Sequence, residues 1–227
     1  MFDRISPGYD RLNRIISAGL DGRWRRRVAD LLPARPNLHV LDLATGTGDQ
    51  LLAVLGSGRV QEGVGLDLAE RMLDVGRVKL AARSDLPAAR LGVGDAMAIP
   101  EPDAAFDAVT ISFGIRNVPD VPRALREMHR VLKPGGRLLV LESSVPTWAP
   151  VRAAYLFYIR HVMPTIAGWL SGDRAAYRYL NVTMEQFPHG PAFCRLMEDA
   201  GFAAVQAHPQ CFGSVTIYQG DRPGGAA

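Results

Sequence analysis

The feature that most constrains this chain of 227 residues is an alternation, from His39 onward, of short apolar runs with amphipathic stretches. Short apolar runs predict buried strands, and amphipathic stretches predict helices that pack on a sheet. Because crossover helices join parallel strands, the pattern indicates an α/β fold with helices on both faces of a mostly parallel sheet. The first strands are expected at residues 39–43, 63–67, 89–93, 107–112 and 137–142.

Further elements are expected at both ends of the chain. Segments 203–207 and 214–219 predict two more strands that pair as an antiparallel hairpin, which brings the sheet to seven strands. Residues 1–33 predict two helices, one beginning at Ser6 and Pro7 and one running from near Asp21 to before Pro33. Residues 146–190 hold eight of the seventeen aromatic residues and no clean strand, which predicts a helical insertion before the last strands.

Composition excludes several classes of protein. Cys194 and Cys211 are the only cysteines, too few for a disulfide framework and without zinc-site spacing. The sequence contains no signal segment and no long uncharged apolar run, so a soluble, cytoplasmic protein is expected. Net charge is +3, and the one arginine cluster surrounds Trp24. We interpret that cluster as a solvated helix face with one buried aromatic, in preference to a patch for anionic lipid or RNA, and expect no nucleic-acid partner.

A glycine loop follows the first predicted strand and opens a helix. Its glycines, Gly46 and Gly48, let the backbone approach a ligand at the start of that helix, which indicates a nucleotide-like cofactor. The dinucleotide fingerprint is incomplete, because Leu51 stands where a third glycine is needed and no basic residue is near for a pyrophosphate. A plain strand-to-helix turn is the alternative interpretation.

Carboxylates follow the next two predicted strands. Asp67 comes about twenty residues after the glycines, where a carboxylate accepts both ribose hydroxyls of a nucleoside. Asp95 and Ala96 follow the third strand, and a carboxylate there can accept from an adenine amino group. Open α/β sheets bind ligands at this edge, so the three features together predict a cofactor site.

These features resemble the first three motifs of class I S-adenosylmethionine-dependent methyltransferases. A more specific resemblance, to the C-methyltransferases of ubiquinone and menaquinone biosynthesis, covers nearly the whole chain. It rests on Phe2–Ile5, Tyr9-Asp10, Thr110–Val118 (TISFGIRNV), Arg130–Gly136 (RVLKPGG), Tyr177–Leu180 and Phe187-Pro188. The chain departs from the family at Asn181–Met184, which changes the expected lid, and it starts at the first motif, which leaves open whether a short leader is missing.

The resemblance implies a single Rossmann-like class I methyltransferase domain over residues 1–227, with N-terminal helices in 1–33 and a helical lid in 146–190. The implied reaction is S-adenosylmethionine-dependent C-methylation of a prenylated quinol, demethylmenaquinol to menaquinol. A ubiquinone-pathway benzoquinol, another small hydrophobic acceptor, and a non-catalytic partner protein of a quinone assembly are the alternatives. The glycine loop would receive the methionine portion of the cofactor, and Asp42 would hold either the loop or, through water, the cofactor's ammonium. The implied cofactor contacts are Gly46, Thr47, Gly48, Asp67, Asp95, Ala96 and Ser112.

The expected catalytic residues are Arg116, Asn117 and Tyr9. Arg116 would stabilise the developing phenolate of the quinol, Asn117 would orient the hydroxyl or a water, and Tyr9 is a weaker partner. None of them is a base at neutral pH, so water is the expected proton acceptor. No histidine and carboxylate cluster occurs, and no metal is expected. Peripheral contact of the aromatic insertion with the inner face of the membrane, and a homodimer, are left open.

Overall fold

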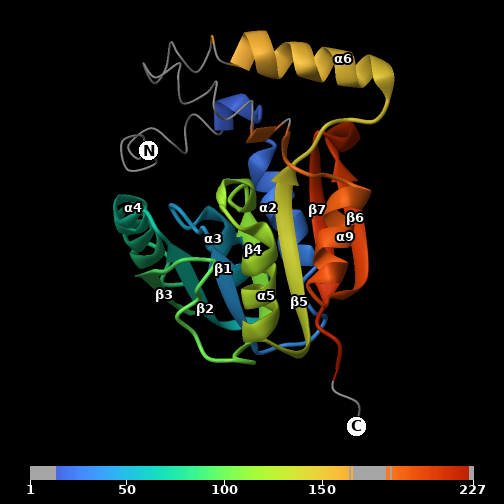
Figure 1. The fold of residues 1–227 in the computed structure, drawn as a ribbon. Coiled ribbons are helices and arrows are strands. Elements are labelled where there is room, and N and C mark those ends of the chain that lie inside the picture. The colour runs from blue at the N-terminus through green and yellow to red at the C-terminus, as the bar shows by residue number, and fades with distance from the viewer. Residues whose placement is uncertain (1–13, 164, 166–182, 185, 225–227) are drawn as a thin grey trace.

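The computed structural model describes residues 14–163, 165, 183–184 and 186–224 (Figure 1). Its seven strands form one sheet in the order β3-β2-β1-β4-β5-β7-β6. Strands β1 to β5 pair in parallel with one another, and β7 lies antiparallel between β5 and β6. The predicted seven-stranded, mostly parallel sheet is therefore confirmed. The strands are β1 (Leu38–Leu43), β2 (Val60–Asp67), β3 (Ala88–Val93), β4 (Phe106–Ser112), β5 (Leu132–Ser143), β6 (Ala203–Gln210) and β7 (Val215–Asp221).

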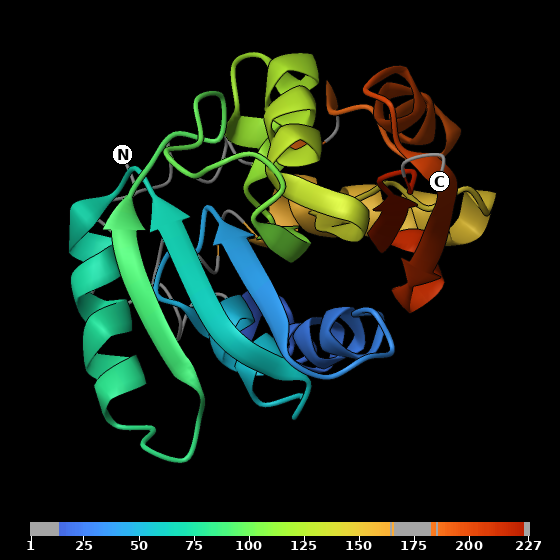
Figure 2. The ribbon, with the colours of Figure 1, turned by 90° about the horizontal axis from the view of Figure 1, so that it is seen from below.

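Helices cover both faces of the sheet, as Figure 2 shows from below. On one face α2 (Asp21–Asp30) packs against α3 (Asp49–Leu55) and β5, and α4 (Glu70–Ala81) packs against β2 and β3. On the other face α5 (Val121–Val131) and α9 (Pro191–Asp199) lie against β5 and β6. Each face has its own apolar core, so both sides of β1, β4 and β5 are buried. Such double burial explains why these strands are continuous apolar runs.

The arginine-rich segment forms α2, and the interpretation of a solvated face is confirmed for most of it. Trp24 is 8% exposed and packs in the core, while Arg23, Arg26 and Arg27 face solvent. Arg25 differs from its three neighbours because it is half-buried. The helix thus anchors to the sheet through its apolar stripe and presents Arg25 toward the interior.

The insertion is described only in part. Its first residues form α6 (Ala149–Phe157) and continue as the π-helix η4 (Tyr158–Val162). Figure 1 shows α6 lying across the top of the molecule, above the tip of β5. The aromatic residues Trp169, Tyr177 and Tyr179 fall outside the described residues. The helix predicted to begin at Ser6 is described only from Arg14, and residues 14–16 are helical. No helix in the described ranges has the length and apolar character needed to cross a membrane.

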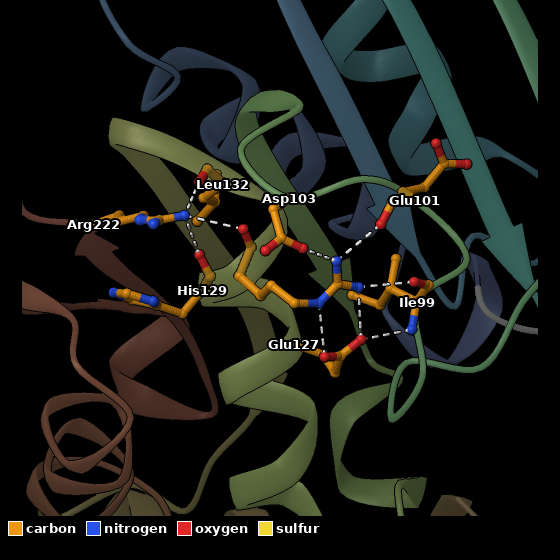
Figure 3. A network of polar contacts seen from close by, with 8 residues as sticks. Ile99, Glu101, Asp103, Glu127, His129, Leu132 and Arg222 are labelled. Carbon is orange, nitrogen blue, oxygen red and sulfur yellow. Dashed lines mark hydrogen bonds and ion pairs between the residues drawn. The ribbon is translucent and has the colours of Figure 1, made fainter.

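A polar network fastens the far end of α5 to the segment between β3 and β4 (Figure 3). Arg130 donates to the carbonyls of Ile99 and Glu101, at 2.9 and 3.0 Å, and pairs with Asp103 and Glu127. The neighbouring carboxylates hold the pKa of Arg130 above its usual range. The first residue of the RVLKPGG string therefore has a structural role, at the opposite edge of the sheet from the glycine loop.

Strand β5 is longer than the strand predicted at residues 137–142. Helix α5 ends at Val131, and β5 already begins at Leu132. Leu132 pairs with Phe106, and the register then shifts before Ala108 pairs with Arg137. The Pro-Gly-Gly residues are thus an irregularity inside a longer strand pairing, which a local turn signal cannot reveal.

Candidate active site

The glycine loop that follows β1 is fixed from below by a buried carboxylate. Asp42 is fully buried, and it accepts hydrogen bonds from the hydroxyls of Thr45 and Thr110, both at 2.6 Å. Burial raises the pKa of Asp42 to about 6, although these two hydrogen bonds lower it. Of the two roles expected for Asp42, the structure shows that of holding the loop, because both carboxylate oxygens bind loop or strand hydroxyls.

The loop itself needs glycine. Gly46 and Gly48 have φ angles of +56° and +82°, in the left-handed region that other residues enter at a cost. The loop after β4 comes so close that a Cβ on Gly114 would lie 2.4 Å from the Cβ of Ala44. Two strand-end loops are therefore packed together, and backbone rather than side chains forms the floor between them.

Asp67 joins the end of β2 to the glycine loop. Its two carboxylate oxygens accept from the backbone N–H groups of Gly46 and Ala69, each at 2.8 Å. A carboxylate has about four acceptor positions, so the half-buried side chain retains positions for further hydroxyl donors. Asp95 is held similarly at the end of β3, where one oxygen accepts from Met97 N at 2.8 Å. The structure thus brings Asp67, Asp95 and the loop to one edge of the sheet.

Thr47 and Ser112 contact other polar side chains near the loop. Lys79 donates to Thr47 Oγ1 at 2.9 Å and to Asp49 at 2.7 Å. Ser112 at the end of β4 donates to Gln50 Oε1 at 3.0 Å, and Gln50 in turn donates to the backbone carbonyl of Arg25. These contacts connect α2, α3, α4 and β4 around the same loop.

An open pocket with an empty volume of about 360 Å³ lies above this loop. Its lining comes from α2, the glycine loop, the start of α3 and the end of β4. Expected cofactor contacts Gly46, Thr47 and Ser112 are among the lining residues, and Arg25, Gln50 and Phe113 are members that sequence reasoning missed. Their proximity depends on how α2 and α3 pack, so no local motif in the sequence indicates it.

Arg116 and Asn117 lie on η3 (Ile115–Asn117), the 3-10 turn just after β4, as expected. The Arg116 side chain is only 7% exposed and forms an ion pair with the fully buried Glu142 of β5. Three buried atoms here, Arg116 Nε, Asn117 Oδ1 and Glu142 Oε2, have no hydrogen-bond partner among the described residues. Arg116, the cation expected to stabilise the phenolate, is therefore already paired with Glu142.

Glu142 was missed by sequence reasoning because it ends an apolar strand, LLVLE, and stands 26 residues from its partner. The only available signal was a carboxylate at the carboxyl end of a parallel strand.

Tyr9, the third expected catalytic residue, falls outside the described residues. His129 packs edge-on against Phe202, with ring centroids 5.2 Å apart. No cluster of three or more potential metal ligands occurs within the described ranges.

The polar groups at this edge of the sheet fit S-adenosylmethionine. Carboxylates at the ends of β2 and β3 suit ribose hydroxyls and an adenine amino group, and the pocket over β1 and β4 adjoins them in the sheet order. The left-handed glycines allow close approach of a ligand to the backbone. When bound, this cofactor supplies an electrophilic methyl group on a sulfonium.

Comparison with known proteins adds to this geometry. The ubiE/COQ5 methyltransferase family matches residues 1–222. A demethylmenaquinone methyltransferase of Thermus thermophilus is 46% identical over 223 residues, which cover 98% of this chain and 100% of that protein. The ubiquinone/menaquinone biosynthesis C-methyltransferase UbiE of Geotalea daltonii is 40% identical over 225 residues, 98% of this chain and 94% of its own.

Solved structures share the fold at lower identity. A SAM-dependent methyltransferase of Thermotoga maritima matches with a TM-score of 0.67 at 18% identity, covering 97% of this chain and 98% of its own. The [4+2]-cyclase SpnF matches with a TM-score of 0.63 at 19% identity, covering 99% and 94%. Because a cyclase shares this architecture, the fold alone does not define the reaction.

Proposed function

The chain belongs to the ubiE/COQ5 methyltransferase family, and from this we propose that it transfers the methyl group of S-adenosylmethionine to a ring carbon of a demethylated, prenylated quinol. The observation that carries the proposal is the 46% identity, over 98% of this chain and 100% of the relative, to a demethylmenaquinone methyltransferase. We take demethylmenaquinol as the acceptor. A benzoquinol is the second candidate, since the Geotalea daltonii relative is named for both pathways.

The cofactor would be held along the carboxyl edge of the sheet. Asp67 would accept the ribose hydroxyls and Asp95 the adenine amino group, with Ala96 beside the base. Gly46, Thr47, Gly48 and Ser112 would surround the methionine portion. The arrangement of β3, β2, β1 and β4 as successive neighbours supports this order of contacts.

The acceptor would meet Arg116 and Asn117. Arg116 keeps an Nε–H donor, and Asn117 an Oδ1 acceptor, that no described residue uses. A donor and an acceptor on adjacent residues suit a phenolic hydroxyl and the water that takes its proton. Asn117 accepts a hydrogen bond from that water, and Arg116 donates to the phenolic oxygen as negative charge develops. Glu142 holds the guanidinium in place through their ion pair. Tyr9 is a further proposed partner.

The proposed reaction balances without a metal or an oxidant. Beside Arg116 and Asn117 the quinol hydroxyl would give its proton to water, and the bound cofactor would supply the methyl group to the ring carbon, with its carbon–sulfur bond as the bond that breaks. Loss of the ring proton and reprotonation of the oxygen then restore the aromatic quinol. The reduced acceptor is required, because a quinone ring lacks the electron-rich carbon that attacks the methyl group.

We also propose that α6 contacts the membrane surface from which a prenylated acceptor would enter. Two large apolar side chains of this segment, Trp148 and Phe157, are 66% and 61% exposed. Arg152 and Arg160 are exposed alongside them and suit anionic headgroups. The helix lies above the edge that carries the proposed site (Figure 1).

The cellular test is the quinone content of the source organism after deletion of this gene. The proposed function predicts accumulation of a demethylated quinone and loss of its methylated product, both restored by the wild-type gene. The identity of the accumulated ring decides between naphthoquinol and benzoquinol. An unchanged quinone profile would contradict the proposal.

A further inference from the structure

The pocket over the glycine loop contains a cation that forms no ion pair with a described carboxylate. Arg25 of α2 lines this pocket, together with the loop residues and Phe113. Its guanidinium carbon lies 6.0 Å from the centre of the Phe113 ring. Its Nε is buried and has no hydrogen-bond partner among the described residues. A buried donor without a partner is costly, so a ligand group that accepts from it would stabilise the site.

The carboxylates near Arg25 already have other partners. Asp49, which also lines the pocket, forms an ion pair with Lys79 at 2.7 Å. Asp42 lies below the loop and accepts from two threonine hydroxyls. Arg25 forms no ion pair within the described ranges, although its charge lowers the pKa of the buried Asp42. It is therefore a cation without a direct carboxylate partner on the side of α2.

The position of Arg25 limits which part of the cofactor it can meet. Asp67 and Asp95 stand on β2 and β3, toward one edge of the sheet, whereas α2 packs against α3 and β5, on the other side of β1. A cofactor whose adenosine occupies the carboxylate side therefore has its methionine portion under α2. That portion carries two cationic groups, the sulfonium and the ammonium, and one anionic group, the α-carboxylate.

We propose that Arg25 binds the α-carboxylate of the methionine portion of S-adenosylmethionine, and so fixes the end of the cofactor opposite the adenine. The proposal rests on the cofactor of the proposed function but not on its acceptor. A guanidinium offers a planar pair of N–H donors that matches a carboxylate, and it repels the two cationic groups. Phe113 and Gln50 keep the side chain over the pocket, through the ring contact and the hydrogen bond to the Arg25 carbonyl.

The test compares two ligands that differ only in the carboxylate: S-adenosylhomocysteine and its decarboxylated analogue, S-adenosyl-3-thiopropylamine. Calorimetry would measure both on the wild type, Arg25→Gln, Arg25→Lys and the matched control Arg26→Gln, whose side chain faces solvent on the same helix. Arg25→Gln is expected to weaken S-adenosylhomocysteine about tenfold to a hundredfold. The analogue should change by no more than about twofold, because it lacks the group that Arg25 binds.

The remaining variants make the result specific. Lysine should restore only part of the affinity, since it cannot form the paired hydrogen bonds, and Arg26→Gln should affect neither ligand. Equal losses for both ligands would overturn the proposal, because Arg25 would then only shape the pocket. Unchanged affinity for S-adenosylhomocysteine would overturn it too, as would a wild type that binds neither ligand. A carboxylate-specific loss in a protein that methylates no quinol would support Arg25 and contradict the proposed acceptor.

Discussion

At Asp67 one carboxylate connects the fold to the proposed site, because it holds Gly46 and Ala69 while facing the cofactor edge. Asp67→Ala is expected to weaken S-adenosylhomocysteine binding by about 1.5–3 kcal/mol, since two ribose hydroxyls would lose a charged acceptor. Calorimetry measures this directly, with Asp74→Ala as a control on the exposed surface of α4. Unchanged affinity would remove Asp67 from the cofactor site.

Variants of the buried pair of Arg116 and Glu142 can distinguish an effect on catalysis from an effect on stability. Arg116→Ala is expected to lower turnover about a hundredfold, and also to lower the free energy of unfolding by roughly 3 kcal/mol, because Glu142 is left buried and unpaired. Adding Glu142→Gln should recover most of the stability but not the turnover. Denaturant unfolding and initial rates test the two effects. Turnover that returned along with stability would show that Arg116 only supports the fold.

Among the elements, α6 carries the clearest prediction. Replacing Phe157 and Trp148, which directly precedes α6, by serine should reduce co-sedimentation with anionic lipid vesicles several-fold, because the two side chains are the large exposed apolar groups of this segment. Val78→Ser on α4, another exposed apolar position, is the matched control. Rates with a short, water-soluble acceptor should stay unchanged in the double variant. Equal vesicle binding by all three proteins would exclude α6 as the contact.

Elements that depend on local patterns were predictable, and those that depend on distant pairing were not. The apolar runs located every strand to within a few residues, except at Leu132, where pairing with Phe106 extends β5 beyond its apolar part. The hairpin of β6 and β7 follows from their short separation, but the insertion of β7 beside β5 does not. In the site, strand-end positions identified Asp67 and Asp95. Glu142 and Arg25 were not predicted, because packing between separate elements brings them to the candidate site.

For the molecule as a whole, Asp42 predicts a specific dependence of stability on pH. Its pKa is about 6 in the folded protein, against an ordinary value of 3.8, so the folded state holds an extra proton between these values. The free energy of unfolding should therefore fall as the pH rises through this window, by at most about 3 kcal/mol from this group. Asp42→Asn removes the titration.

Unfolding in urea at about pH 4 and about pH 7 would isolate this contribution, since other groups titrate alike in both proteins. The free energy of unfolding of Asp42→Asn, relative to that of the wild type, should be higher at about pH 7 than at about pH 4. A difference that does not change with pH would mean that Asp42 keeps an ordinary pKa despite its burial.

The most direct test of the central claim is methyl transfer by the purified protein. The assay combines S-adenosylmethionine carrying a deuterated methyl group with a short-chain demethylmenaquinol kept reduced, and mass spectrometry locates the label. We predict one deuterated methyl group on a ring carbon of the quinol, and none on the oxidised quinone under the same conditions. A protein that binds the cofactor but leaves every reduced demethylated quinol unlabelled, or places the label on oxygen, would contradict it.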